Sequence, residues 1–177
     1  MLKSIKFTTF GIVILAVTIS LPLWFNTNLF DDAYIHARII RNWIDFGFPS
    51  FLIGQEFKAS SSTGYISIIF FLSKFLDILD AIVFFQIISI FLYVFSAQIV
   101  IKSFKGFNKF LAFISICAAL PYFLIAAYGG MESSIILPLL LLFFIFDKRN
   151  KTFLSLSMVA IAVTLRFEML SLFLPLI

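Results

Sequence analysis

The sequence predicts an all-α, polytopic membrane protein, and three observations support this fold class. Hydrophobic residues make up 62% of the 177 residues, and only 12% of the residues are charged. The mean hydropathy is +1.12. Long apolar runs alternate with short basic clusters. A soluble domain of this size has no use for so much apolar surface, whereas helices that cross lipid require it.

Apolar runs predict about five membrane spans and the beginning of a sixth, because about 20 apolar residues cross a bilayer as a helix. The runs cover residues 7–25, 81–101, 110–127, 133–146, 152–165 and 167–177. The first run lacks a small-residue cleavage site, so we expect a retained span there and not a signal peptide. The last run is much shorter than a span. We therefore expect residues 1–177 to be a single membrane module, the N-terminal part of a longer protein or a truncated product, and inactive alone.

Residues 26–80 predict an outer loop between the first and second spans, with 81–177 holding the remaining spans. This loop has four basic and six acidic residues, a net charge of −2. The lysines at 102–109 and the basic residues at 148–151 alternate with it, so the positive-inside rule places 26–80 outside. Its end, 65–79, is apolar but interrupted by charges, which predicts an interfacial or re-entrant helix.

Residues 31–46 predict an amphipathic helix within this outer loop. Four large apolar residues recur at helical spacing and form one stripe: Ile35, Ile39, Trp43 and Phe46. Asp31 or Asp32 suits the N-terminal position, where a carboxylate can accept hydrogen bonds from free backbone N–H groups. Gly47 and Pro49 predict the end of the helix.

Ionisable residues beside apolar spans are candidates for function by default. Three groups fall on the predicted outer side: Asp31 and Asp32 with Arg38 and Arg41, then Glu132, then Arg166 and Glu168. Arginine binds phosphate through paired hydrogen bonds, and a carboxylate can remove the proton of a hydroxyl group. Together these residues predict chemistry on a phosphate-bearing lipid at the outer surface.

Each candidate also has a purely structural interpretation. The two aspartates can serve only as helix caps, and Glu132 can be an ordinary loop acid. Both arginines of the helix at 31–46 can pair with Asp45 and extend to water. Arg166 and Glu168 can simply pair with each other. These alternatives stay open at the level of the sequence.

Scarce residue types exclude several kinds of site. Cys117 is the single cysteine and lies in an apolar run, which excludes an internal disulfide and a cysteine metal site. His36 is the single histidine, which excludes a multi-histidine metal cluster, and we expect it at the surface or in an ion pair. The net charge of +4 comes from basic clusters between spans, so we expect no nucleic-acid partner.

Four short motifs carry a family resemblance. They read D-D-A-Y-I-H-A-R-I-I-R-N-W at 31–43, G-Q-E-F-K-A-S-S-S-T-G-Y at 54–65, G-G-M-E-S-S at 129–134 and T-L-R-F-E at 164–168. Their order and spacing resemble the GT-C superfamily of polytopic glycosyltransferases, in particular its bacterial arabinofuranosyl- and mannosyltransferase-like branch. The chain departs from the family pattern at two places, Gly64 and Phe167. Thr63-Gly64-Tyr65 replaces the family's Ser-Pro-Leu, and Phe167 lies where the family has a proline.

The resemblance implies transfer of a sugar from a polyprenyl-phosphate donor to a cell-envelope glycan, lipid or protein acceptor. The reaction would take place at the outer face of the bacterial cytoplasmic membrane. Asp31 or Asp32 would be the base of an inverting displacement, Glu132 would line the same cavity, and Arg166 would bind phosphate. The residues leave open whether a divalent cation, Mg²⁺ or Mn²⁺, assists, with Asp32 and Glu132 as oxygen ligands.

Two other functions stay open. A transporter or flippase component for a lipid-linked anion would use the same residues for binding only. An inactive fragment would serve as a membrane scaffold. Acids buried in the middle of spans would favour transport, and in this sequence the acids gather at one predicted face.

Overall fold

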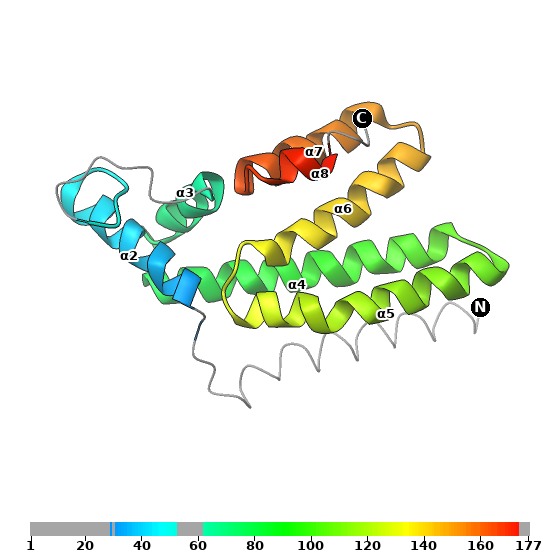
Figure 1. Ribbon diagram of the computed structural model, residues 1–177, viewed down its shortest axis with the longest axis horizontal. Coiled ribbons are helices and arrows are strands. Elements are labelled where there is room, and N and C mark those ends of the chain that lie inside the picture. The colour runs from blue at the N-terminus through cyan, green and yellow to red at the C-terminus, as the bar shows by residue number, and fades with distance from the viewer. Residues whose placement is uncertain (1–28, 30, 53–61, 174–177) are drawn as a thin grey trace.

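The computed structural model describes residues 29, 31–52 and 62–173, with side chains described up to residue 171. The predicted first span at 7–25 and most of the motif at 54–65 lie outside these residues. The helices are α2 (Asp31–Phe46), α3 (Thr63–Leu72), α4 (Ile78–Ser103), α5 (Gly106–Tyr128), α6 (Ser133–Lys148), α7 (Thr152–Leu165) and α8 (Met169–Phe173). The described residues contain no strand, so the all-α prediction is confirmed (Figure 1).

Two of these helices are long and apolar enough to cross a membrane. They are α4, with 26 residues, and α5, with 23 residues. The runs predicted as spans at 133–146 and 152–165 form helices of 16 and 14 residues, shorter than the roughly 20 that a perpendicular span needs. The apolar run at 65–79 holds most of the 10-residue α3, then a turn, and then the first two residues of α4. Two helices thus qualify by length, and the larger number of spans stays a prediction.

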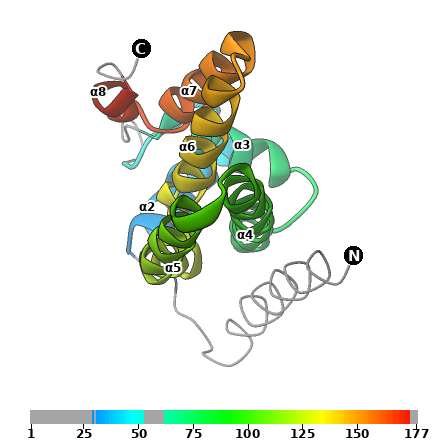
Figure 2. The same ribbon diagram turned by 90° about the vertical axis from the view of Figure 1, so that its right-hand side faces the viewer.

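Helices α4 to α7 run back and forth, and α6 packs between α4 and α7 (Figures 1 and 2). Helix α5 lies against α4 and α6, where the stacked rings of Tyr93 and Phe123 are 4.2 Å apart. The main core joins five helices, α2, α3, α4, α6 and α7. Its largest members include Ile40, Tyr65, Phe85, Phe143 and Leu165. This core fixes the end of the bundle at which the polar motifs meet.

The two ends of the bundle differ in charge. Lys148 donates a hydrogen bond to the carbonyl of Ser103 (3.4 Å) and lies 3.8 Å from the ring centroid of Phe104. The α4–α5 and α6–α7 connections therefore lie at the same end, together with Lys102, Lys105, Lys109, Lys148, Arg149 and Lys151. Helices α2 and α3 and the α5–α6 turn lie at the opposite end (Figure 1).

Helix α2 has the predicted bounds and the predicted stop. Asp31 and Asp32 are in its first turn, and Gly47 follows with a φ of +83°. The N–H of Gly47 donates to the carbonyl of Trp43 (3.1 Å). A positive φ is costly for residues with a Cβ atom, so glycine at this position allows the chain to turn away from the helix.

The predicted apolar stripe of α2 is wrong at both ends. Ile35 is 36% exposed and Phe46 is 47% exposed, while Ile39 is buried and Trp43 is half-buried. The buried face instead carries Ala33, His36, Ile39, Ile40 and Asn42. The reason is the tight approach of the α5–α6 turn to α2, since a Cβ atom at Gly130 would lie only 2.9 Å from that of Ala33. Only small side chains fit such a contact, so residue size and not hydrophobicity alone orients the helix.

Candidate functional site

Glu132 is a buried carboxylate at the turn between α5 and α6. It occupies the position just before α6, yet its side chain makes no capping hydrogen bond to that helix. The residue is only 5% exposed. A buried charge is costly unless nearby groups compensate it. The partial positive charge at the N-terminus of α6 supplies part of this compensation, and side-chain partners supply more.

Two side chains from distant parts of the sequence meet one oxygen of Glu132. The hydroxyl of Ser62 donates to Oε1 at 2.8 Å, and this bond is buried. Nη1 of Arg166 lies 3.5 Å from the same oxygen. The other oxygen, Oε2, is buried and accepts no hydrogen bond from the described residues. The carboxylate therefore keeps one acceptor that no described side chain uses.

Arg166 joins this carboxylate to a second one. Its Nε lies 3.4 Å from Oε2 of Glu168, and its side chain is 33% exposed. Arg166 and Glu168 do pair, as the purely structural alternative expected. The guanidinium of Arg166 also lies close to the buried Glu132, which that alternative did not include. We call Ser62, Glu132 and Arg166, with the nearby His36 and Asp32, the Glu132 cluster.

The turn that carries Glu132 is held by buried polar contacts. The hydroxyl of Tyr65 donates to the carbonyl of Gly130 (2.9 Å), and the side-chain amide of Gln86 donates to the carbonyl of Met131 (3.2 Å). Ser134 donates in turn to Gln86. Burial raises the pKa of the Tyr65 hydroxyl, and the Glu132 carboxylate raises it further, so this hydroxyl stays a neutral donor.

Gly64 explains one departure from the family pattern. A Cβ atom at this position would lie 2.3 Å from the backbone oxygen of Thr164. Helices α3 and α7 therefore touch through their backbones at this point. Because no side chain fits between them, glycine brings the segment at 62–65 directly against the segment at 164–168. The contact places Ser62 and Arg166 at the same carboxylate. The structure gives no reason for Phe167, which is exposed.

His36 is the member of the cluster that the sequence analysis missed as a site residue. It is 5% exposed, so the expected surface position is wrong, and its ring centroid lies 5.1 Å from that of Tyr65. Burial lowers the pKa of the imidazole below its ordinary value of 6.5. The charges of Glu132 and Asp32 oppose this shift, and the charge of Arg166 adds to it. The imidazole is therefore neutral at pH 7 and close to three charged groups.

The two candidate aspartates differ in their relation to this cluster. Asp32 lies four residues before His36 on the same face of α2 and is close enough to influence its pKa. Both aspartates are exposed, and Asp31 is turned by about 100° around the helix from Asp32. The structure thus brings Asp32 toward the Glu132 cluster, and Asp31 lies at its margin.

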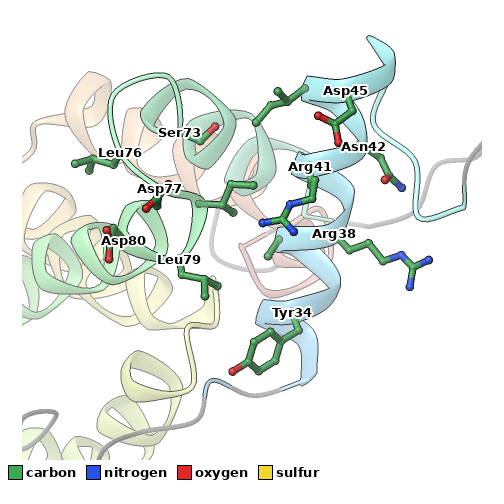
Figure 3. Close-up of a pocket in the computed structure, with 13 residues that line it drawn as sticks. Tyr34, Arg38, Arg41, Asn42, Asp45, Ser73, Leu76, Asp77, Leu79 and Asp80 are labelled. Atoms are coloured by element: carbon green, nitrogen blue, oxygen red, sulfur yellow. The ribbon is translucent and has the colours of Figure 1, made fainter.

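Arg38 and Arg41 lie on the opposite face of α2 from His36. Both are exposed and line an open groove between α2 and the α3–α4 turn (Figure 3). Arg38 extends away from the groove, where its guanidinium carbon lies 5.0 Å from the ring centroid of Phe51. Neither arginine forms an ion pair with Asp45 in the part of the chain that the structure describes. Their predicted role in binding the same substrate as Glu132 stays a prediction.

The described residues give no support for a metal site built from acidic side chains. No group of three or more His, Cys, Asp or Glu side chains suited to a metal ion occurs among them. Asp32 and Glu132, the predicted ligands, approach the same histidine but no third carboxylate joins them. We therefore derive no step through a metal ion.

The four motifs that carry the family resemblance meet at one end of the bundle as far as they are described. Asp32 and His36 come from the first, Ser62 and Tyr65 from the second, Gly130 and Glu132 from the third and Arg166 from the fourth. Comparison of the chain with protein-family models, curated proteins and solved structures found no match.

Proposed function

We propose that this protein is a membrane glycosyltransferase, or a module of one, that uses a polyprenyl-phosphate sugar as donor. The observation that carries the proposal is the convergence on Glu132 of polar residues from three other segments of the chain. A buried, ion-paired carboxylate beside a neutral histidine and a second carboxylate is typical of sites that move protons. The family resemblance of those segments supplies the type of reaction.

Asp32 is the residue we assign as the catalytic base. It would remove the proton of the acceptor hydroxyl while that oxygen forms a bond to the anomeric carbon of the donor. The bond between the anomeric carbon and the phosphate oxygen breaks, and the polyprenyl phosphate leaves with inversion at that carbon. Asp32 is favoured over Asp31 because it lies on the face of α2 that meets the cluster.

Arg166 is the residue we assign to the phosphate of the donor. Its side chain is 33% exposed, so a ligand can reach it from the solvent, while one of its terminal nitrogens lies beside the buried Glu132. An arginine fixed in this way can stabilise the charge that develops on the leaving phosphate. Glu132 then acts as a positioning residue for Arg166.

We further propose that the chain crosses the membrane five or six times and that the Glu132 cluster faces the outer side of a bacterial cytoplasmic membrane. Two helices with the length of a span and the basic connections at one end support this arrangement. The opposite end, in its described part, carries seven acidic and four basic side chains. They are Asp31, Asp32, Asp45, Asp77, Asp80, Glu132 and Glu168, with Arg38, Arg41, Lys74 and Arg166.

A transfer assay tests the proposal. Membranes that contain the protein are incubated with a panel of polyprenyl-phosphate sugars, and labelled products and retained polyprenyl phosphate are measured. We expect Asp32→Asn to lower turnover by about 10²–10⁴-fold, with a smaller effect of the matched variant Asp31→Asn. Arg166→Gln should weaken retention of polyprenyl phosphate. For residues 1–177 alone, which we expect to be inactive, the readout is retention, and a chain that retains no polyprenyl phosphate would contradict the proposal. In a longer form that transfers sugar, normal turnover of both aspartate variants would contradict the assignment of the base.

A transporter for a lipid-linked anion is the second candidate. It would retain polyprenyl phosphate through Arg166 without forming a new glycosidic bond. Retention and vesicle uptake without transfer, unaffected by Asp32→Asn, would favour it. All described carboxylates except Asp147 gather at one end of the bundle, and none of them lies in the middle of α4 or α5, which supports surface chemistry instead.

A further inference from the structure

The groove on the far face of α2 is a second, separate polar site. It has a volume of about 990 Å³ and lies between α2 and the turn that joins α3 to α4. Arg41 and His36 are five residues apart, which turns them by about 140° around the helix. The groove therefore faces away from the Glu132 cluster, and the proposed sugar transfer does not use it.

Charged side chains of both signs line the groove. Arg41 points across it from α2, which also carries Asp45, and Asp77 and Asp80 lie on the other wall at the beginning of α4 (Figure 3). Arg41 forms no ion pair with any of these aspartates among the described residues, although all of them line the same space. An occupant with one anionic and one cationic group would pair with Arg41 and with the aspartates.

A smaller, mainly apolar cavity adjoins this groove. It has a volume of about 230 Å³ and shares Tyr34 and Leu79 with the groove. Its lining follows α4 through Val83, Gln86 and Ile90. Leu79 and Val83 are 46% exposed. A charged groove beside a mainly apolar surface along a candidate span fits an amphiphile, with its head between the charged side chains and its chain along the helix.

We propose that this groove binds the head group of a zwitterionic phospholipid with a primary amine, phosphatidylethanolamine. Its phosphate would accept hydrogen bonds from Arg41. Its ammonium group would donate to Asp77 and Asp80, and one acyl chain would lie along Leu79 and Val83. A quaternary ammonium head group has no N–H to donate, so phosphatidylcholine would bind less well. A purely anionic lipid would meet the repulsion of two carboxylates.

The bound lipid would link α2 to the beginning of α4. These two helices are in contact, and residues of both line the groove. A head group that bridges Arg41 and the two aspartates would hold the groove at a fixed width. The lipid would thus act as a structural ligand, and its binding would be independent of donor or acceptor.

Lipid retention by the whole chain tests the inference. The protein is placed in nanodiscs with equal amounts of phosphatidylethanolamine, phosphatidylcholine and phosphatidylglycerol, extracted in mild detergent, and analysed for retained lipid by mass spectrometry. We expect phosphatidylethanolamine to be enriched about twofold to fivefold over each of the others, the range for charge pairs in a solvated groove. Arg41→Gln and the double variant Asp77→Asn, Asp80→Asn should each abolish the enrichment.

Matched controls separate this site from general attraction by charge. Arg38→Gln removes the same charge from the same helix but from a side chain that points away, so enrichment should persist. Asp147→Asn removes an acid from the basic end and should also have no effect. The proposal would be overturned if phosphatidylglycerol were the enriched lipid and if Arg41→Gln and Arg38→Gln lowered its enrichment equally. Equal retention of all three lipids, or displacement of phosphatidylethanolamine by polyprenyl phosphate, would also overturn it.

Discussion

The partners of Glu132 allow a quantitative prediction about which one stabilises the fold. Ser62 and Glu132 are both buried, and their hydrogen bond is 2.8 Å long. A hydrogen bond to a buried charge contributes about 1.5–3 kcal/mol. The pair of Arg166 and Glu132 is longer, at 3.5 Å, and the arginine is one-third exposed. Solvent-screened pairs of this kind contribute about 0.2–1 kcal/mol. The neutral serine should therefore contribute more than the charged arginine.

A double-mutant cycle measures both couplings. The variants are Ser62→Ala, Arg166→Met and Glu132→Ala, alone and in pairs, unfolded by denaturant in detergent micelles and followed by far-UV circular dichroism. The cavity left by Glu132→Ala cancels within each cycle. We expect about 1.5–3 kcal/mol for the serine cycle and below about 1 kcal/mol for the arginine cycle. The comparison holds if all variants have the same m-value, the slope of the unfolding free energy against denaturant concentration.

Glu168→Ala supplies the matched control, since its pair with Arg166 lies at the surface. A cycle between these two residues should give a coupling near zero. A larger coupling for the arginine than for the serine would refute the reasoning from burial. It would mean that the Glu132 charge is screened far less than the exposure of Arg166 indicates.

Three further outcomes follow from other parts of the structure. Gly64→Ala should lower the free energy of unfolding by about 1–3 kcal/mol or more in the same assay, because the added Cβ atom overlaps a backbone oxygen that cannot move aside; unchanged stability would show that α3 and α7 do not touch there. Since burial lowers the pKa of folded His36 below 6.5, the unfolded state binds more protons as the pH falls below 6.5, and stability should decline over that window. His36→Gln should remove this part of the decline, and an identical pH profile would contradict the assignment. In a Cys117→Ala background, an impermeant thiol reagent added outside cells should label Asp45→Cys and leave Lys105→Cys unlabelled; the reverse pattern would invert the proposed topology.

Much of the helical pattern was predictable from the sequence because local signals determine it. The bounds of α2 follow from two aspartates at its start and a glycine after its end. The charges at Lys74 and Asp77 mark the break between α3 and α4, but the single helix predicted over 65–79 is wrong, since α3 ends at Leu72 and α4 begins at Ile78. Glu132 and Arg166 were also predicted as site residues. They do form an ion pair, although their roles in a reaction stay predictions.

The burial of individual side chains was less predictable, because it depends on contacts between distant segments. Large apolar residues on α2 suggested one orientation, but the close approach of Gly130 to Ala33 imposes another. His36 is buried for the same reason. A usable signal existed in Ala33, His36 and Ile40, which recur at i, i+3 and i+7 and form a narrow stripe. This stripe can be recognised as the buried face of α2 only when it is known that the α5–α6 turn, with Gly130, packs on it.

The ion pair between Glu132 and Arg166 has a consequence for the order of assembly. The carboxylate and the guanidinium are separated by the whole of α6 and α7, so the pair cannot form until α7 has been synthesised. Until then Glu132 has its contact with Ser62 but lacks its cation. A ribosome-bound chain that ends before Arg166 would therefore carry an uncompensated acid at the α5–α6 turn, which is an unfavourable state in a low-dielectric setting. Once Arg166 has been synthesised, its ion pair with Glu132 would stabilise the packing of the α6–α7 hairpin against α3 and α4.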